Sequence, residues 1–303
     1  MDDVKSVTEG VEEDFVIKNK NYGEQYANEP YTEQTANFEV QGHPDIRNIE
    51  FLPDGSYVVN YSHSRNNFYD APQNNERIPV LMIESEGKKV QVALKSMRHS
   101  RDWSSEDELK RGTYTCEDGK YILHDRGWIV EGNTLYINEY GEVQTYTIEN
   151  LPKRKQDELT RKLCHTWDIQ DAFIKLYSIE DGKRKLWLSY QLNEEEMKEY
   201  LVKYFIFSQT GYFYRFLYDG SNNGNGDWDW TDINKQILHY NFLYYSFYET
   251  TPVYGENDVE IYFSNNNLYL MERVEVLDED DDYDRKLEAQ ALYKLELTDE
   301  FKY

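Results

Sequence analysis

Basic residues are scarce in this sequence of 303 residues, which has 33 Lys and Arg against 58 Asp and Glu. The formal net charge is −25 at pH 7. Proteins that bind nucleic acid or an anionic membrane surface need a basic patch, so the composition argues against both kinds of partner. Mimicry of DNA is compatible with such a charge, and so is the simpler role of keeping a protein in solution. We therefore expect no nucleic-acid partner.

Cysteine and long apolar runs are lacking too. The two cysteines, Cys116 and Cys164, are too few for a disulfide framework and do not have the spacing of a metal site. Two free thiols and one bridge are the alternatives for this pair. No apolar run is long enough to cross a bilayer, and no secretory signal follows Met1. The sequence thus predicts neither a disulfide scaffold nor a transmembrane segment.

The motifs of common enzymes are absent from the sequence. Its six histidines are scattered, and it has no HExxH, GxSxG, P-loop or dinucleotide fingerprint. Residues 219–227 alternate oxygen-bearing side chains as a calcium loop does, but Trp230 stands where an EF-hand needs a bidentate Glu. A hairpin loop rich in Gly and Asn explains this stretch as well, and a solvated loop explains the acidic run at residues 278–284. We expect no enzyme activity, no cofactor and no metal.

Aromatic residues, in contrast, are abundant, at 16% of the chain with 28 Tyr. In residues 202–247, three runs of aromatic and β-branched residues are separated by turn clusters, which is typical of an antiparallel meander. Neither face of residues 212–218 is plainly polar, so we expect both faces to make contacts. Short strands of this kind continue to Leu297 and indicate an up-and-down barrel or a sandwich. A closed barrel is favoured because it leaves no unpaired edge.

Three short motifs lie in the second half of the chain. They are Leu163-Cys164-His165-Thr166-Trp167, Phe205-Ile206-Phe207 followed by Gly211-Tyr212-Phe213, and Gly226-Asp227-Trp228-Asp229-Trp230. They are similar to the first strand, a hairpin and a G-x-W-x-W strand of the lipocalin-like domains of the calycin group, especially those of Bacteroides-type envelope proteins. The resemblance covers about residues 163–297 and implies a barrel that often holds one small molecule. It also implies a cell-envelope or secreted location, as a periplasmic or outer-membrane lipoprotein tethered through a lipidated N-terminus.

We expect an all-β chain with two antiparallel β modules in tandem and short helices at the linker. Residues 1–40 are acidic and poor in aliphatic side chains, which predicts a polar tether. Residues 41–150 carry their own strands and turns and predict an N-terminal β module, either a barrel or a sandwich. Leu151-Pro152 opens a charged helix, so residues 151–163 form the linker and residues 164–303 the lipocalin-like up-and-down barrel. A further short helix is expected with Asn193 as its cap.

These features predict a non-catalytic extracytoplasmic binding protein, with a small apolar or amphipathic ligand in the second barrel. The residues expected to bind it are Tyr212, Tyr214, Phe216, Trp228, Trp230, Tyr240 and Tyr244. The alternatives are a protein-interaction or adhesion module of the cell envelope, and glycan binding through Trp103, Trp187 and Tyr254. The expected partner is therefore a small molecule, a glycan or an envelope protein. Tyr side chains that merely fill strand positions are the structural alternative.

Overall fold

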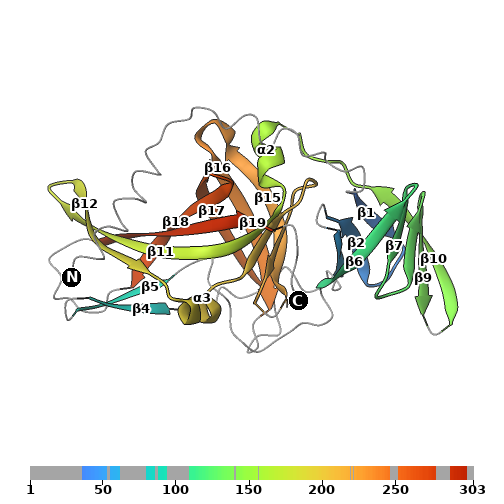
Figure 1. Ribbon diagram of the computed structural model, residues 1–303, viewed down its shortest axis with the longest axis horizontal. Helices are drawn as coiled ribbons and strands as arrows, with labels where there is room; N and C mark the ends of the chain where they lie inside the picture. The colour runs from blue at the N-terminus through green and yellow to red at the C-terminus, as the bar shows by residue number, and fades with distance from the viewer. Residues whose placement is uncertain are drawn as a thin grey trace.

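The computed structural model describes residues 36–52, 55–61, 80–85, 88–93, 109–139, 141–155, 157–218, 220, 222–245, 252–277 and 287–298. This part of the chain forms two closed barrels of eight antiparallel strands each, with two short α-helices (Figure 1). The predicted all-β class with two tandem modules is confirmed, and the N-terminal module is a barrel. Residues 1–35, Trp103 and residues 278–284 lie outside the described part.

The first barrel follows the chain in an up-and-down order that is interrupted once. Its strands are β1 (Ala36–Gln41), β2 (Ile46–Phe51), β3 (Ser56–Tyr61), β6 (Leu109–Glu117), β7 (Lys120–Leu123), β8 (Trp128–Glu131), β9 (Thr134–Glu139) and β10 (Glu142–Asn150), and β10 closes the ring against β1. Alternate side chains, such as Ile49 and Phe51 of β2, fill the interior. β1 begins inside the stretch that we predicted as a tether, because Phe38 and Val40 are buried in this interior.

The second barrel is also up-and-down. Its strands are β11 (Thr166–Glu180), β13 (Tyr204–Phe207), β14 (Tyr212–Phe216), β15 (Asn222–Asp232), β16 (Ile237–Tyr245), β17 (Pro252–Ser264), β18 (Asn267–Leu277) and β19 (Leu287–Leu297), and β19 closes the ring against β11. The predicted meander over residues 202–247 is confirmed by the pairing of β13, β14, β15 and β16. β12 (Lys183–Gln191) forms a hairpin with the far half of β11 and extends the sheet beyond the ring.

One hairpin from the first half of the chain belongs to the second barrel. β4 (Val80–Ser85) and β5 (Lys88–Ala93) leave the first barrel between β3 and β6, and β5 pairs with the end of β18, where Val92 lies opposite Val276 (Figure 1). The buried side chains of the hairpin join the second core; they are Leu81, Ile83, Val90 and Val92. The predicted division at residue 150 does not hold here, because an alternating pattern reveals a buried face but not the sheet that buries it.

The two short helices flank β11 and β12. α2 (Glu158–Leu163) is shorter than the predicted helix over residues 153–163, because the side chain of Asp157 accepts a hydrogen bond from the backbone N–H of Thr160 and caps it there. α3 (Glu194–Tyr200) begins after Asn193, whose predicted role as the cap is confirmed. The chain between β10 and α2 thus crosses from one barrel to the other as an extended segment.

Candidate functional site

The end of the second barrel beside α2 is closed by buried indole rings. Trp167, at the start of β11, is fully buried, and its ring nitrogen donates a hydrogen bond to the carbonyl oxygen of Leu163 at 2.8 Å. Trp228 of β15 is equally buried and donates to the carbonyl oxygen of Ser208 at 2.9 Å. Its ring meets that of Phe207 edge to face, with centroids 6.1 Å apart. This end of the interior is therefore packed.

Further along the interior, four neighbouring strands bring polar side chains together. They are Tyr240 from β16, Asn257 from β17, Glu272 from β18 and Tyr293 from β19, and all are buried. The hydroxyl of Tyr293 donates to one carboxylate oxygen of Glu272 at 2.7 Å, and Nδ2 of Asn257 donates to the other at 2.5 Å. Nδ2 of Asn257 also donates to the hydroxyl of Tyr240 at 3.3 Å. We call these four residues the interior polar cluster.

The wall beside this cluster is built from small side chains. Ala291 lies directly opposite Glu272 in the pairing of β18 with β19, and Ala172 lies opposite Tyr293 in the pairing of β19 with β11. Ala289 precedes Ala291 by two residues and shares its face, and all three alanines are buried. An eight-stranded barrel is just wide enough for its own side chains or for one small ligand. Small inward residues beside a carboxylate are compatible with the second use.

The interior also contains a basic side chain. Arg215 of β14 is 0% exposed, and it follows Phe213 by two residues, so both side chains point to the same inward face. The ring of Phe213 packs against that of Tyr240, with centroids 4.5 Å apart. A buried acid, a buried base and aromatic rings thus lie in one interior, which combines polar and apolar groups.

Four of the seven residues predicted to bind a ligand belong to β15 and β16. Trp228 and Tyr240 point into the barrel, the first at the packed end and the second in the interior polar cluster. Trp230 lies beside α2, where its ring nitrogen donates to the hydroxyl of Thr160 at 3.0 Å. The backbone of Tyr244 pairs with that of β17, and its side chain lies outside the described part of the structure. Of the three whose side chains the structure describes, Tyr240 alone belongs to the interior polar cluster.

The other three predicted residues, Tyr212, Tyr214 and Phe216, lie on the outer face of β14. They pack with Leu52 and Val58 of the first barrel. The prediction that they line the interior is therefore wrong. Both faces of β14 carry aromatic side chains, and both are buried because the first barrel covers the outer one. The pattern alone could not decide which face points inward.

Sequence reasoning did not identify Glu272, Asn257 and Tyr293. A signal was nevertheless present, because Glu272 lies two residues from both Leu270 and Val274, and residues at this spacing share one face of a strand. An acid at an inward position of an otherwise apolar strand is unusual unless it has partners. The partners themselves come from strands whose register the sequence does not determine.

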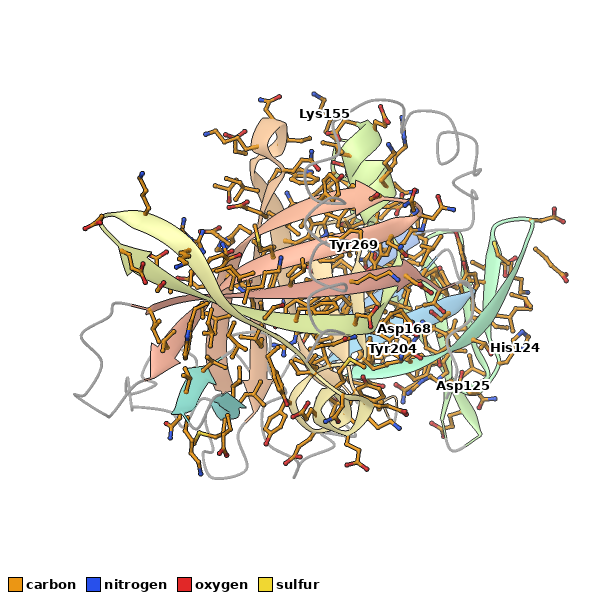
Figure 2. The ribbon with its side chains drawn as sticks, turned by 60° about the vertical axis from the view of Figure 1, so that its left-hand side comes forward. His124, Asp125, Lys155, Asp168, Tyr204 and Tyr269 are labelled. Carbon is orange, nitrogen blue, oxygen red and sulfur yellow. The ribbon has the colours of Figure 1, made fainter. Side chains whose placement is uncertain are left out.

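The first barrel has a polar cluster of its own at the turn between β7 and β8. Figure 2 labels Asp125 of this turn. The hydroxyl of Tyr57 donates to Oδ1 of Asp125 at 2.6 Å, and Nε of Arg126 donates to the Tyr57 oxygen at 3.0 Å. Burial and the Asp125 carboxylate raise the pKa of Tyr57 well above its usual value. The guanidinium of Arg126 also lies over the ring of Trp128, 4.9 Å from its centroid. The acid and the base satisfy each other here, so this cluster stabilises the turn.

No family model matches the chain, and no match was found among curated proteins or solved structures. The lipocalin-like resemblance therefore rests on its three motifs. In the part of the chain that the structure describes, no group of three or more His, Cys, Asp and Glu side chains could hold a metal ion. Of the stretch that resembles a calcium loop, residues 222–227 belong to β15.

Three further findings bear on the sequence predictions. Cys116 and Cys164 are both free thiols. Trp187, a predicted glycan-binding residue, is half-buried and packs against the core of the second barrel, while the side chain of Tyr254 is outside the described residues. Within the described ranges, no helix combines the length and the apolar character that a membrane crossing requires.

Proposed function

We propose that this chain is a non-catalytic binding protein whose second barrel holds one small amphipathic molecule. The observation that carries the proposal is the interior polar cluster, in which the carboxylate of Glu272, 1% exposed, meets side chains from the strands on either side. A barrel that needed only stability would be served as well by apolar side chains, because a buried charge is costly to desolvate. A few placed polar groups in an apolar interior are typical of ligand sites.

The chemistry of the cluster indicates which end of a ligand it would bind. An ionised carboxylate only accepts hydrogen bonds, so the matching group is a donor such as an amine or a hydroxyl. The rings of Tyr240 and Phe213 beside it offer faces to an alkyl chain or to a cation. The proposal includes an extracytoplasmic location, which the motif resemblance of residues 163–297 supports.

Three short probes with one common tail test this function: octylamine, octanol and octanoate, titrated against the full chain by calorimetry and tryptophan fluorescence. We expect one saturable site that prefers the amine or the alcohol, because Glu272 repels a second carboxylate. Glu272→Gln removes the charge at constant size and should weaken binding of the amine by about tenfold, which corresponds to the loss of one charge-assisted hydrogen bond.

Glu260→Gln is the matched control, since Glu260 is an exposed acid on the neighbouring strand β17. It should bind all three probes as the parent protein does. Thermal unfolding of both variants establishes that they are folded at the titration temperature. Absence of saturable binding by any probe, or equal binding of the amine by the parent and Glu272→Gln proteins, would contradict the proposed function.

A further inference from the structure

The two barrels meet through their outer faces, and the contact has an apolar core. Its members are Leu52, Val58, Tyr204, Ile206, Tyr214 and Phe216. Hydrogen bonds between the barrels flank this core: Nδ2 of Asn37 donates to Oγ1 of Thr210 at 2.9 Å, and Nδ2 of Asn225 donates to Oδ1 of Asn60 at 3.2 Å. We call this contact the junction. It belongs to neither barrel interior and is separate from the proposed ligand site.

One carboxyl group lies within the junction. Glu50 of β2 points away from its own barrel and is 3% exposed. It accepts hydrogen bonds from three hydroxyl groups of the second barrel, those of Ser208, Tyr214 at 2.6 Å and Thr210 at 3.3 Å. Each of these hydroxyls can accept as well as donate, so the same cage fits the neutral and the ionised carboxyl.

The cations around the junction are engaged elsewhere, and Glu50 forms no ion pair with a described residue. Arg47 lies over the ring of Tyr212 at 5.8 Å, and Arg111 lies over the ring of Phe216 at 5.4 Å and donates to Ser56. Arg154 of the extended segment pairs with Asp229 at 2.9 Å. Only Lys153 favours the ionised carboxylate through its charge, and burial lowers the pKa of Lys153 itself.

We propose that the junction is a proton-controlled latch, in which neutral Glu50 holds the two barrels together and ionised Glu50 loosens them. Separation stays limited, because the extended segment and the β4–β5 hairpin still connect the barrels. The junction would then respond to pH although neither barrel core changes. Ser208 contacts both the junction and the packed end of the second barrel. Its side chain donates a hydrogen bond to Glu50, and its carbonyl oxygen accepts one from the indole N–H of Trp228.

The sign of the effect follows from desolvation. Burial raises the pKa of Glu50 from 4.5 to about 7, against the opposite influence of the three hydroxyls and Lys153. Closing the junction therefore favours the protonated form, so closure is strongest below pH 4.5, weakens as the pH rises towards 7, and is constant above that. This rise in the pKa of Glu50, from 4.5 to about 7, corresponds to a change of roughly 300-fold in the equilibrium constant for closing the junction.

Hydrogen exchange of the full chain, followed by mass spectrometry between pH 5 and pH 8.5, measures this equilibrium. The observed exchange rates are first corrected for the intrinsic rates. For peptides from β2, β13 and β14, we then expect the equilibrium constant for opening to rise by roughly two orders of magnitude across this pH range. Glu50→Gln should abolish the pH dependence and keep the junction closed at pH 8. Glu39→Gln, at an exposed position of β1, should behave as the parent protein does. Equal pH dependence in the parent and Glu50→Gln proteins would overturn the latch.

Tyr214→Phe provides an independent test that does not require the Glu50 variant to fold. Its lost hydroxyl is one of the groups that lower the pKa of Glu50. The midpoint of the opening transition should therefore move to higher pH, while the apolar packing of the ring is kept. An unchanged midpoint, or a move to lower pH, would also overturn the proposal.

Discussion

Replacing Trp167 with alanine is expected to destabilise the second barrel by about 3–5 kcal/mol, which is the usual cost of removing a buried indole from a core. The ring is 0% exposed, and its nitrogen donates to the carbonyl oxygen of Leu163, so it joins the end of α2 to the start of β11. The centroid of the indole also lies 6.1 Å from that of the Phe263 ring on β17. Truncation therefore removes apolar contacts and the indole hydrogen bond to the Leu163 carbonyl oxygen, which keeps the backbone N–H of His165 as a donor.

Trp187→Ala is the matched control. Trp187 lies on β12, outside the closed ring, and is only half-buried against the core. Its truncation should cost about 1 kcal/mol or less. Calorimetry and urea unfolding of both variants beside the parent protein give the comparison. If Trp167→Ala unfolds as the parent does, the indole does not close the barrel.

Gly226→Ala is expected to destabilise the same barrel by about 3 kcal/mol, through overpacking rather than a cavity. A Cβ atom on Gly226 would lie 2.1 Å from the backbone carbonyl oxygen of Asn241 and 2.6 Å from its Oδ1. Backbone cannot yield as the end of a flexible side chain can, so β15 and β16 would have to move apart. The hydrogen bond from the backbone N–H of Asp227 to Oδ1 of Asn241, 2.9 Å long, would be strained as well.

Asp227→Ala tests the same strand without the clash, because the side chain of Asp227 is exposed and its backbone N–H is retained. Its effect should stay within about 0.5 kcal/mol. Chemical denaturation followed by tryptophan fluorescence reports on this region, since Trp228 is the next residue. Equal midpoints for Gly226→Ala and the parent protein would mean that the two strands can separate here without cost.

Most strands and the up-and-down order of the meander over residues 202–247 could be predicted from the sequence, because alternation and turn residues are local signals. The helix cap at Asn193 followed from an equally local motif. The interior polar cluster could not be assembled in this way. Its four side chains come from four strands, and it is the register between strands that brings Asn257 and Tyr293 to Glu272.

The contacts between the two barrels could not be predicted from the sequence either. Tyr214 was expected to bind a ligand inside the barrel because neither face of residues 212–218 is plainly polar, yet a second module can bury an outer face equally well. Glu50 has the appearance of a solvated acid between Ile49 and Phe51, and only the presence of the second barrel makes it a buried one. Such positions can be recognised only when the relative arrangement of the modules is known.

The β4–β5 hairpin has a consequence for how the protein is made. Val92 of β5 pairs with Val276 of β18, so β5 completes a sheet whose last strands are synthesised much later than β5 itself. Such non-local pairing is slow, because a long stretch of chain must be closed before the contact forms. Until then the apolar side chains of the hairpin have no partner sheet. The first barrel can form before this hairpin has its partner strand. We therefore expect assembly of the second barrel to be the slower step of folding.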